Sequence, residues 1–212
     1  MSDENACVLG PIRVAVKDTI GPSNTPTGIN KQPVAGRVFL GEFGLEGDFQ
    51  VDSRVHGGLD KAVYHFPLEN YRVLKEAFPH LAENLDKPCV GENFSTFGMT
   101  ESNVFIGDIY TVGETEIQVS QPRMPCWKLN QRIGNAHVLE LVIMQKITGW
   151  YYRVLKEGFV GQGDELKLKT RVQDEYNIEK IWEHWITLRQ QGVQVAKPLE
   201  INGLSPQWRF DW

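Results

Sequence analysis

Apolar and polar residues alternate along short stretches in the first two-thirds of the chain, and glycines separate these stretches. Such alternation is typical of β-strands, whose successive side chains point to opposite faces. The clearest stretch, 115–120, follows 103–112 across Gly113-Glu114, which predicts a hairpin turn between two strands. Shorter stretches predict further strands at 13–17, 36–41, 62–66 and 163–169.

Three other stretches carry apolar residues at helical spacing. The first begins at Pro67 and ends at Pro79. The second, 136–148, follows a capping Asn135, and it is so apolar that we expect it to be buried on most sides. The third begins after the N-cap Asn177 and ends at Gly192. Its apolar face consists of Ile178, Ile181, Trp182, Trp185 and Leu188.

The charged stretch 171–175 separates the strand-rich part of the chain from the third helix. The expected fold class is therefore mainly β with α (α+β). A β-rich body occupies residues 1–170, with its core at about 10–170, and a small helical C-terminal domain occupies 174–212. A length of 212 residues suits one full domain with such an appendage.

Charge and cysteine content narrow the class of protein. The chain has 22 basic and 27 acidic residues, a net charge of −5, which excludes a general coat for DNA or RNA. Three cysteines, an odd number, favour a reduced cytoplasmic setting over a disulfide framework. The polar start at residues 1–5 carries no secretory or mitochondrial signal. No apolar run reaches the ~18 residues of a membrane span, so no membrane partner is expected.

Two glycine-containing clusters are candidates for ligand contact. In Gly44-Leu45-Glu46-Gly47-Asp48, two glycines bracket carboxylates, which indicates either an ordinary acidic turn or a close approach of backbone to a ligand. In the second cluster, Gly57 and Gly58 free backbone N–H groups for an anion-binding nest, and His56 and Lys61 add basic character. His65 follows on the next strand, where a histidine is more often structural than a ligand.

The third cluster surrounds Cys126 in a turn flanked by Pro122 and Pro125. Arg123 and Lys128 lie close by in sequence, and positive neighbours favour the thiolate that attacks electrophiles or binds soft metals. A buried inert cysteine is the alternative interpretation. Cys7, in the N-terminal tail, and Cys89, in the turn Pro88-Cys89-Val90-Gly91, are weaker candidates.

Several common motifs are absent from the sequence. It has no CxxC pair and no HExxH, so a zinc site is not expected. It also lacks the GxGxxG and GK[ST] phosphate loops and a GxSxG elbow, which removes the usual support for dinucleotide redox chemistry, nucleotide hydrolysis and serine hydrolysis.

Taken in order, five groups of residues resemble a MOSC domain, the molybdenum cofactor sulfurase C-terminal type, and most closely its stand-alone bacterial YiiM-like branch. The groups are Gly44–Asp48, His56–Ala62, Gly91–Thr96, Gly107–Asp108 and Gln121–Leu129. The resemblance spans roughly residues 10–170, and the Trp-rich tail from about 174 resembles the small helical domain of that branch. It implies a β-barrel-like body that holds the molybdenum cofactor (molybdopterin).

The same resemblance implies a reductase of N-hydroxylated compounds, for example N-hydroxylated purines, with a role in detoxifying such bases. The implied enzyme takes electrons from a separate flavin-containing reductase and is independent of pyridoxal phosphate. Cys126 matches the family's proposed ligand to molybdenum and is the catalytic candidate.

The remaining candidates have supporting roles. Cofactor-binding candidates are His56, Gly57, Gly58, Lys61, Asn93, Arg123, Lys128 and Asn130. Candidates for orienting these groups or relaying protons are Asp48, Asp108 and His65. Three alternatives stay open: a carrier that delivers the cofactor or its sulfur without turnover, a cysteine-nucleophile enzyme using Cys126 with a histidine, and an interaction module.

Overall fold

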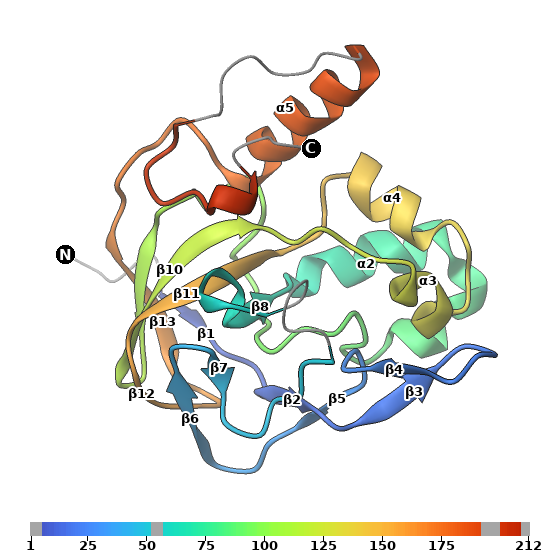
Figure 1. Ribbon diagram of the computed structural model, residues 1–212, viewed down its shortest axis with the longest axis horizontal. Helices are drawn as coiled ribbons and strands as arrows, with labels where there is room; N and C mark the ends of the chain where they lie inside the picture. Colours follow the sequence, from blue (N-terminus) through green and yellow to red (C-terminus); the bar gives the residue numbers. More distant parts are fainter. Residues whose placement is uncertain (1–5, 52–56, 192–199, 209–212) are drawn as a thin grey trace.

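The computed structural model describes residues 6–51, 57–191 and 200–208, and its largest feature is a curled sheet of six strands (Figure 1). The strand order is β1-β13-β9-β10-β11-β8, and every neighbouring pair is antiparallel. The strands are β1 (Ala6–Val8), β8 (Val63–His65), β9 (Ile109–Val112), β10 (Thr115–Pro122), β11 (Trp150–Lys156) and β13 (Glu165–Thr170).

Strand β10 shows why the sheet forms and how it leads to the site. Ile117 and Val119 are fully buried while the alternating residues Glu116 and Gln118 are partly exposed, as the pattern predicts. From Ser120 onward every residue of β10 is buried, and the register with β11 shifts between Val119 and Gln121. Such an irregularity bends a strand. The end of β10 therefore carries the chain into the interior just before the cysteine-containing turn.

Smaller sheets complete the β part of the fold. A three-stranded sheet has the order β12-β6-β7, and two separate ribbons pair β2 with β5 and β3 with β4. The strands are β2 (Arg13–Ala15), β3 (Asp18–Ile20), β4 (Thr25–Thr27), β5 (Lys31–Pro33), β6 (Arg37–Gly41), β7 (Gly44–Leu45) and β12 (Gly158–Gly161). The β3–β4 ribbon lies on the same side of the molecule as the short helix α3 (Figure 1).

Helices gather at one end of the large sheet and enclose a second apolar cluster around Leu74, Leu129 and Val138. They are α2 (Leu68–Ala77), α3 (Lys128–Ile133) and α4 (Val138–Met144), with the 3-10 turn η2 (Pro79–Leu85). A further 3-10 turn, η1 (Leu59–Lys61), lies against β10 and β11 instead. The first predicted helix is confirmed as α2. The expectation of a long, mostly buried helix at 136–148 is wrong: α4 is short and Met144 is 54% exposed.

The third predicted helix is confirmed as α5 (Ile178–Gln191), and the Asn177 carboxamide accepts a hydrogen bond from Lys180 N at 2.8 Å, as an N-cap does. The predicted stop at Gly192 lies outside the described residues. Ile181 and Trp182 of α5 pack in the same apolar core as the large sheet, together with Trp208 of η3 (Pro206–Trp208). Within the described ranges the C-terminal part shares the body's core. The domain boundary near residue 170 stays a prediction.

The fold class is confirmed as mixed β and α with a curled, half-barrel sheet. The predicted strand at 103–112 is too long, since Phe105 makes only an isolated bridge with Asn177, the chain turns at Gly107, and the continuous strand β9 begins at Ile109. At Gly107, φ is +83° and a Cβ would lie 2.7 Å from the carbonyl oxygen of Asn202, so the glycine permits the 200–208 segment to pack there. None of the helices in the described ranges is long and apolar enough to cross a membrane.

Candidate functional site

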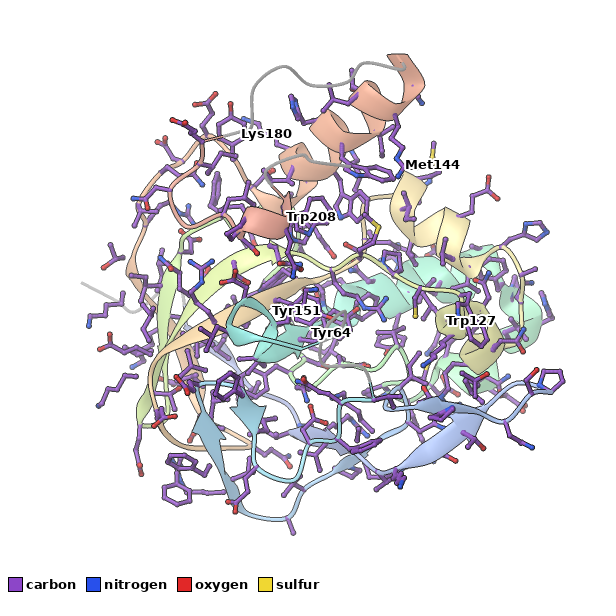
Figure 2. All side chains as sticks on the ribbon, viewed as in Figure 1. Tyr64, Trp127, Met144, Tyr151, Lys180 and Trp208 are labelled. Atoms are coloured by element: carbon purple, nitrogen blue, oxygen red, sulfur yellow. The ribbon has the colours of Figure 1, made fainter. Side chains whose placement is uncertain are left out.

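A pocket with about 620 Å³ of space not filled by protein atoms lies where the end of β10, the start of β11 and the strand β8 meet. Figure 2 shows Tyr64 of β8 and Tyr151 of β11 side by side in the middle of the molecule. The polar side chains that line the pocket are Lys31, Asp48, Gln50, Lys61, Tyr64, Asn93, Arg123, Cys126, Lys128 and Tyr151.

Arg123 forms the buried wall of the pocket. Its guanidinium lies over the ring of Tyr64, 5.0 Å from the centroid, and only 7% of the residue is exposed. Burial opposes its charge, but the phenols of Tyr64 and Tyr151 and the Cys126 thiol hold the pKa of Arg123 above its ordinary value. Its Nε atom is buried with no hydrogen-bond partner in the described part of the chain. Such an atom is available to an anionic ligand.

A buried ion pair forms a second wall. Lys31 Nζ donates to both carboxylate oxygens of Asp48, at 2.7 and 2.6 Å, and the two side chains are 10% and 3% exposed. Asp48 also accepts from Ala15 N at 2.6 Å and from Asn93 Nδ2 at 2.8 Å. Burial lowers the pKa of Lys31, and the charge of Asp48 opposes that shift. Asp48 therefore orients one cation and one amide of the pocket.

Lys61 enters the pocket from the turn η1, which several contacts hold in place. Burial lowers the pKa of Lys61, and the neighbouring carboxylate of Asp60 opposes the shift. Arg153 Nε donates to Asp60 Oδ1 at 2.7 Å, and Ser120 Oγ donates to the Asp60 carbonyl at 2.6 Å. These bonds fix the backbone from which Lys61 extends.

Cys126 lines the pocket, half-buried and not in a disulfide. The helix α3 starts two residues later, where Lys128 Nζ donates to the carbonyl of Pro26 at 2.7 Å and ties α3 to the ribbon β3–β4. Trp127, between them, points away from the centre and is 49% exposed (Figure 2). The turn thus presents the thiol inward and the indole outward.

The charges of the pocket differ from those of the chain. Among the residues that the structure describes, four basic side chains, Lys31, Lys61, Arg123 and Lys128, line it with one carboxylate, Asp48, which leaves a surplus of positive charge there in a chain of net charge −5. Among the described residues, no group of three or more His, Cys, Asp or Glu is placed to hold a metal ion.

Six of the residues predicted for the site line this pocket together. They are Asp48, Lys61, Asn93, Arg123, Lys128 and the catalytic candidate Cys126. The Asn93 carboxamide is engaged by the protein, because Nδ2 donates to Arg13 O and Asp48 while Oδ1 accepts from Tyr64 N at 3.0 Å. Asn93 therefore orders the pocket's framework more than it offers free donors.

Three of the predicted polar side chains do not line the pocket. His65 is fully buried, stacked on Trp150 at 4.6 Å, and burial lowers its pKa to about 3, so it stays neutral in the core. Asp108 is fully buried, and its carboxylate accepts hydrogen bonds from Arg171 Nε at 2.9 Å and from Arg171 Nη2 at 2.8 Å. Asn130 links α3 to α4 by donating to Ala136 O and accepting from Leu139 N. The structure thus gives all three local structural contacts.

The predicted anion-binding nest is only partly described. Gly57 and Gly58 precede η1, and Gly58 has a φ of +102° with its carbonyl accepting from Lys61 N at 2.9 Å. Neither glycine is among the residues that line the pocket. His56 lies outside the described residues.

Sequence reasoning missed Lys31, Tyr64 and Tyr151, together with two lining glycines. Gly28 and Gly91 have no room for a side chain: a Cβ would lie 2.4 Å from Phe49 O at Gly28 and 3.0 Å from Ile29 Cγ1 at Gly91. A glycine is itself a sequence signal of a position without room for a side chain, so these two could have been proposed. No sequence neighbour of Lys31 indicates a role in the site.

This site and its curled sheet define the class of protein. The chain belongs to the MOSC domain family, whose model matches residues 52–167. The MOSC domain is the molybdenum cofactor sulfurase C-terminal type, and the family includes reductases associated with that cofactor.

Particular relatives sharpen the placement. Protein YiiM of Escherichia coli (strain K12) is 41% identical over 187 residues, which cover 88% of this chain and 83% of YiiM. The crystal structure of YiiM from Escherichia coli matches with a TM-score of 0.70 at 35% identity, over 93% of this chain and 89% of that chain. A protein of Gibberella moniliformis (strain M3125 / FGSC 7600) named "Reductase" is 34% identical over 178 residues. That match covers 84% of this chain but 30% of the fungal protein.

Proposed function

We propose that this chain binds the molybdenum cofactor in the pocket, with Cys126 as the protein ligand to molybdenum, and reduces N-hydroxylated compounds such as N-hydroxylated purines. The observation that carries the proposal is the meeting of the Cys126 thiol with Lys31, Lys61, Arg123 and Lys128 in one pocket. A soft thiolate suits a metal that already carries sulfur ligands. The excess positive charge suits the cofactor's anionic groups.

The chemistry of the pocket fits the cofactor in detail. The unpartnered Nε of Arg123 can donate to a phosphate or oxo group, and the guanidinium keeps its charge at every physiological pH. Burial raises the pKa of Tyr151, so its phenol stays protonated and can serve as a neutral donor. Gly28 and Gly91 line the pocket, where glycine lets the backbone approach a bound group.

When bound, the cofactor supplies the metal through which an electron pair reaches the substrate. Cleavage of the N–O bond also consumes a pair of protons and releases the amine and water. Lys61 is one lining group suited to hold one of these protons, because burial makes its Nζ ammonium a stronger acid than that of an exposed lysine. Asp48 keeps Lys31 in place and so preserves the positive potential of the pocket.

The electrons are proposed to come from a separate flavin-containing reductase, since the sequence has no dinucleotide-binding loop of its own. The setting proposed for this reaction is the cytoplasm, where removal of N-hydroxylated bases protects nucleotide pools. The fungal relative named "Reductase" supports the reductive class of reaction.

Reduction of N-hydroxylaminopurine by the full chain tests the proposal. The protein is produced in a host that makes the cofactor, and a chemical reductant replaces the electron donor. Wild type is expected to form the amine, and Cys126→Ser to lose most of the activity and the molybdenum. Cys7→Ser is the matched control, because Cys7 is equally half-buried but lies outside the pocket. Bound cofactor without turnover would favour the carrier function instead, and full activity of Cys126→Ser would refute the ligand role.

A further inference from the structure

Two consecutive residues, Thr148 and Gly149, connect the pocket to the rest of the protein. The carbonyl of Thr148 accepts a hydrogen bond from the Tyr64 hydroxyl at 2.8 Å. The carbonyl of Gly149 accepts from Arg123 N at 3.0 Å. Both donors belong to residues that line the pocket. The positions of Arg123 and of the ring beneath its guanidinium therefore depend on this dipeptide.

The C-terminal helix holds the same dipeptide from the other side. Trp182 Nε1 of α5 donates to Thr148 Oγ1 at 2.7 Å, and the Thr148 hydroxyl donates in turn to the Gly149 carbonyl at 3.1 Å. Trp182 is fully buried, and Thr148 is 2% exposed. Water does not compete for these bonds, and successive buried bonds reinforce one another. An unbroken series of hydrogen bonds thus runs from α5 to the backbone of Arg123.

Gly149 itself has no freedom to move. Its φ is +69°, and a Cβ would lie 2.1 Å from the carbonyl oxygen of His65. Its N–H donates to the buried carboxyl of Glu101 at 2.7 Å, which also accepts from Asn70 Nδ2 at 2.8 Å. With its backbone held on both sides, the dipeptide transmits a displacement of the Thr148 side chain rather than absorbing it.

The segment 200–208 makes a second contact of the same kind. Ser205 Oγ donates to Asp60 Oδ2 at 2.8 Å, and Ser205 N donates to Ser120 O at 2.9 Å. Asp60 precedes Lys61, which lines the pocket. The C-terminal part of the chain therefore contacts the supports of two pocket cations, Arg123 and Lys61.

We propose that Trp182 is a positioning residue for the site, and that α5 sets the place of Arg123 beside Cys126 through Thr148 and Gly149. The identity of the group that the pocket binds rests on the proposed function. The positioning itself concerns only this chain. Arg123 and Cys126 line the same pocket, so an Arg123 that loses its anchor changes the surroundings of the Cys126 thiol.

The test measures alkylation of Cys126 by iodoacetamide in the full-length, cofactor-free protein, with each cysteine followed on its own peptide by mass spectrometry. Trp182→Phe keeps a buried aromatic ring and removes the N–H donor. Thr148→Val removes the hydroxyl at similar volume. Both are expected to change the alkylation rate of Cys126 by about threefold or more relative to wild type, the size of effect expected when a series of hydrogen bonds between two sites is broken. Because both variants remove the same bond, the double variant is expected to match the single ones.

Matched controls separate positioning from general loss of stability. Trp185→Phe changes the neighbouring tryptophan, whose Nε1 has no hydrogen-bond partner among the described residues, and is expected to leave the alkylation rate within about 1.5-fold of wild type. Thr148→Ser keeps the hydroxyl, and Cys126 in this variant is expected to be alkylated at the wild-type rate. If Trp182→Phe fails to fold, Thr148→Val and Thr148→Ser still decide the question.

Equal rates for Trp182→Phe, Thr148→Val and Trp185→Phe would overturn the positioning role, whatever their melting temperatures. Failure of the proposed function gives a different result. A wild-type protein without molybdenum would contradict the cofactor proposal while the alkylation rates still supported the role of Trp182.

Discussion

Replacing Asp48 with asparagine is expected to destabilise the protein strongly, because it leaves the buried ammonium of Lys31 without a countercharge. The Asp48 carboxylate accepts from Lys31, from Ala15 N and from Asn93 Nδ2, and its side chain is 3% exposed. An asparagine keeps one acceptor oxygen, but its NH₂ group then faces other donors. The variant removes the charge and creates a donor–donor conflict at nearly constant volume.

The magnitude follows from the burial of the pair. Removing one partner of a buried ion pair costs about 3–5 kcal/mol, whereas an exposed pair contributes about 0–1 kcal/mol. Lys31 and Asp48 are 10% and 3% exposed, so we expect a loss of about 3 kcal/mol or more in the free energy of unfolding. The double variant Lys31→Met with Asp48→Asn removes both charges and is expected to recover about 1–3 kcal/mol of that loss.

Urea denaturation followed by tryptophan fluorescence measures these free energies. Asp86→Asn is the matched control, because Lys75 and Asp86 are also 2.7 Å apart but are 36% and 64% exposed. We expect this control to unfold within about 1 kcal/mol of wild type. An Asp48→Asn variant as stable as Asp86→Asn, or a double variant less stable than Asp48→Asn alone, would refute the reasoning about the buried pair.

Three further predictions concern the core around the site. Gly149→Ala is expected to cost more than about 3 kcal/mol, since its Cβ would lie 2.1 Å from His65 O. Gly36→Ala, with a φ of +77° and open space around the Cβ, is expected to cost about 1–2 kcal/mol. Glu101→Gln is expected to raise the melting temperature at about pH 8 but not near pH 4.5. Burial raises the pKa of Glu101 to about 7, so the stability from its protonated form is present below its unfolded pKa and is lost as pH rises through 7. His65→Gln is expected to reduce the acid sensitivity of the protein. Burial lowers the pKa of His65 to about 3, so its contribution is present above 6.5 and is lost as pH falls toward 3.

Melting temperatures measured across pH 4–8 test both titrating residues, because the stability contribution of Glu101 is lost as pH rises and that of His65 is lost as pH falls. For each residue, the difference in the free energy of unfolding between wild type and variant should change by up to about 1.4 kcal/mol per pH unit between the unfolded and the folded pKa of that residue. A Glu101→Gln or His65→Gln curve parallel to wild type would contradict the assigned burial of that charge. Gly149→Ala and Gly36→Ala of equal stability would contradict the close contact at Gly149.

Local pattern predicted the elements whose buried faces repeat regularly. The alternation in β10 and the apolar face of α5 both correspond to faces buried in the core. The pattern misled at 103–108, where Val104 and Ile106 are buried anchors of a turn and not strand residues. At α4 the apolar composition overstated burial, because the helix covers the core with one side only.

The site was predictable where its residues are close in sequence. Arg123, Cys126 and Lys128 belong to one proline-rich turn, and they line one pocket. Lys31 and Tyr151 come from strands far from that turn, and their own neighbours carry no sign of the role. His65 shows the converse: its residue type suggested chemistry, but a sequence does not reveal that the ring is enclosed between Trp150 and Tyr152.

The central claim is that the pocket holds the molybdenum cofactor through Cys126, and molybdenum-edge X-ray absorption on the full chain tests it most directly. The protein is purified from a cofactor-competent host, and the metal content is measured on the same samples. Wild type and Cys7→Ser are expected to carry molybdenum with the same number of sulfur neighbours, while Cys126→Ser loses the metal or shows one sulfur fewer. Wild-type protein without molybdenum, or an unchanged sulfur shell in Cys126→Ser, would contradict the account.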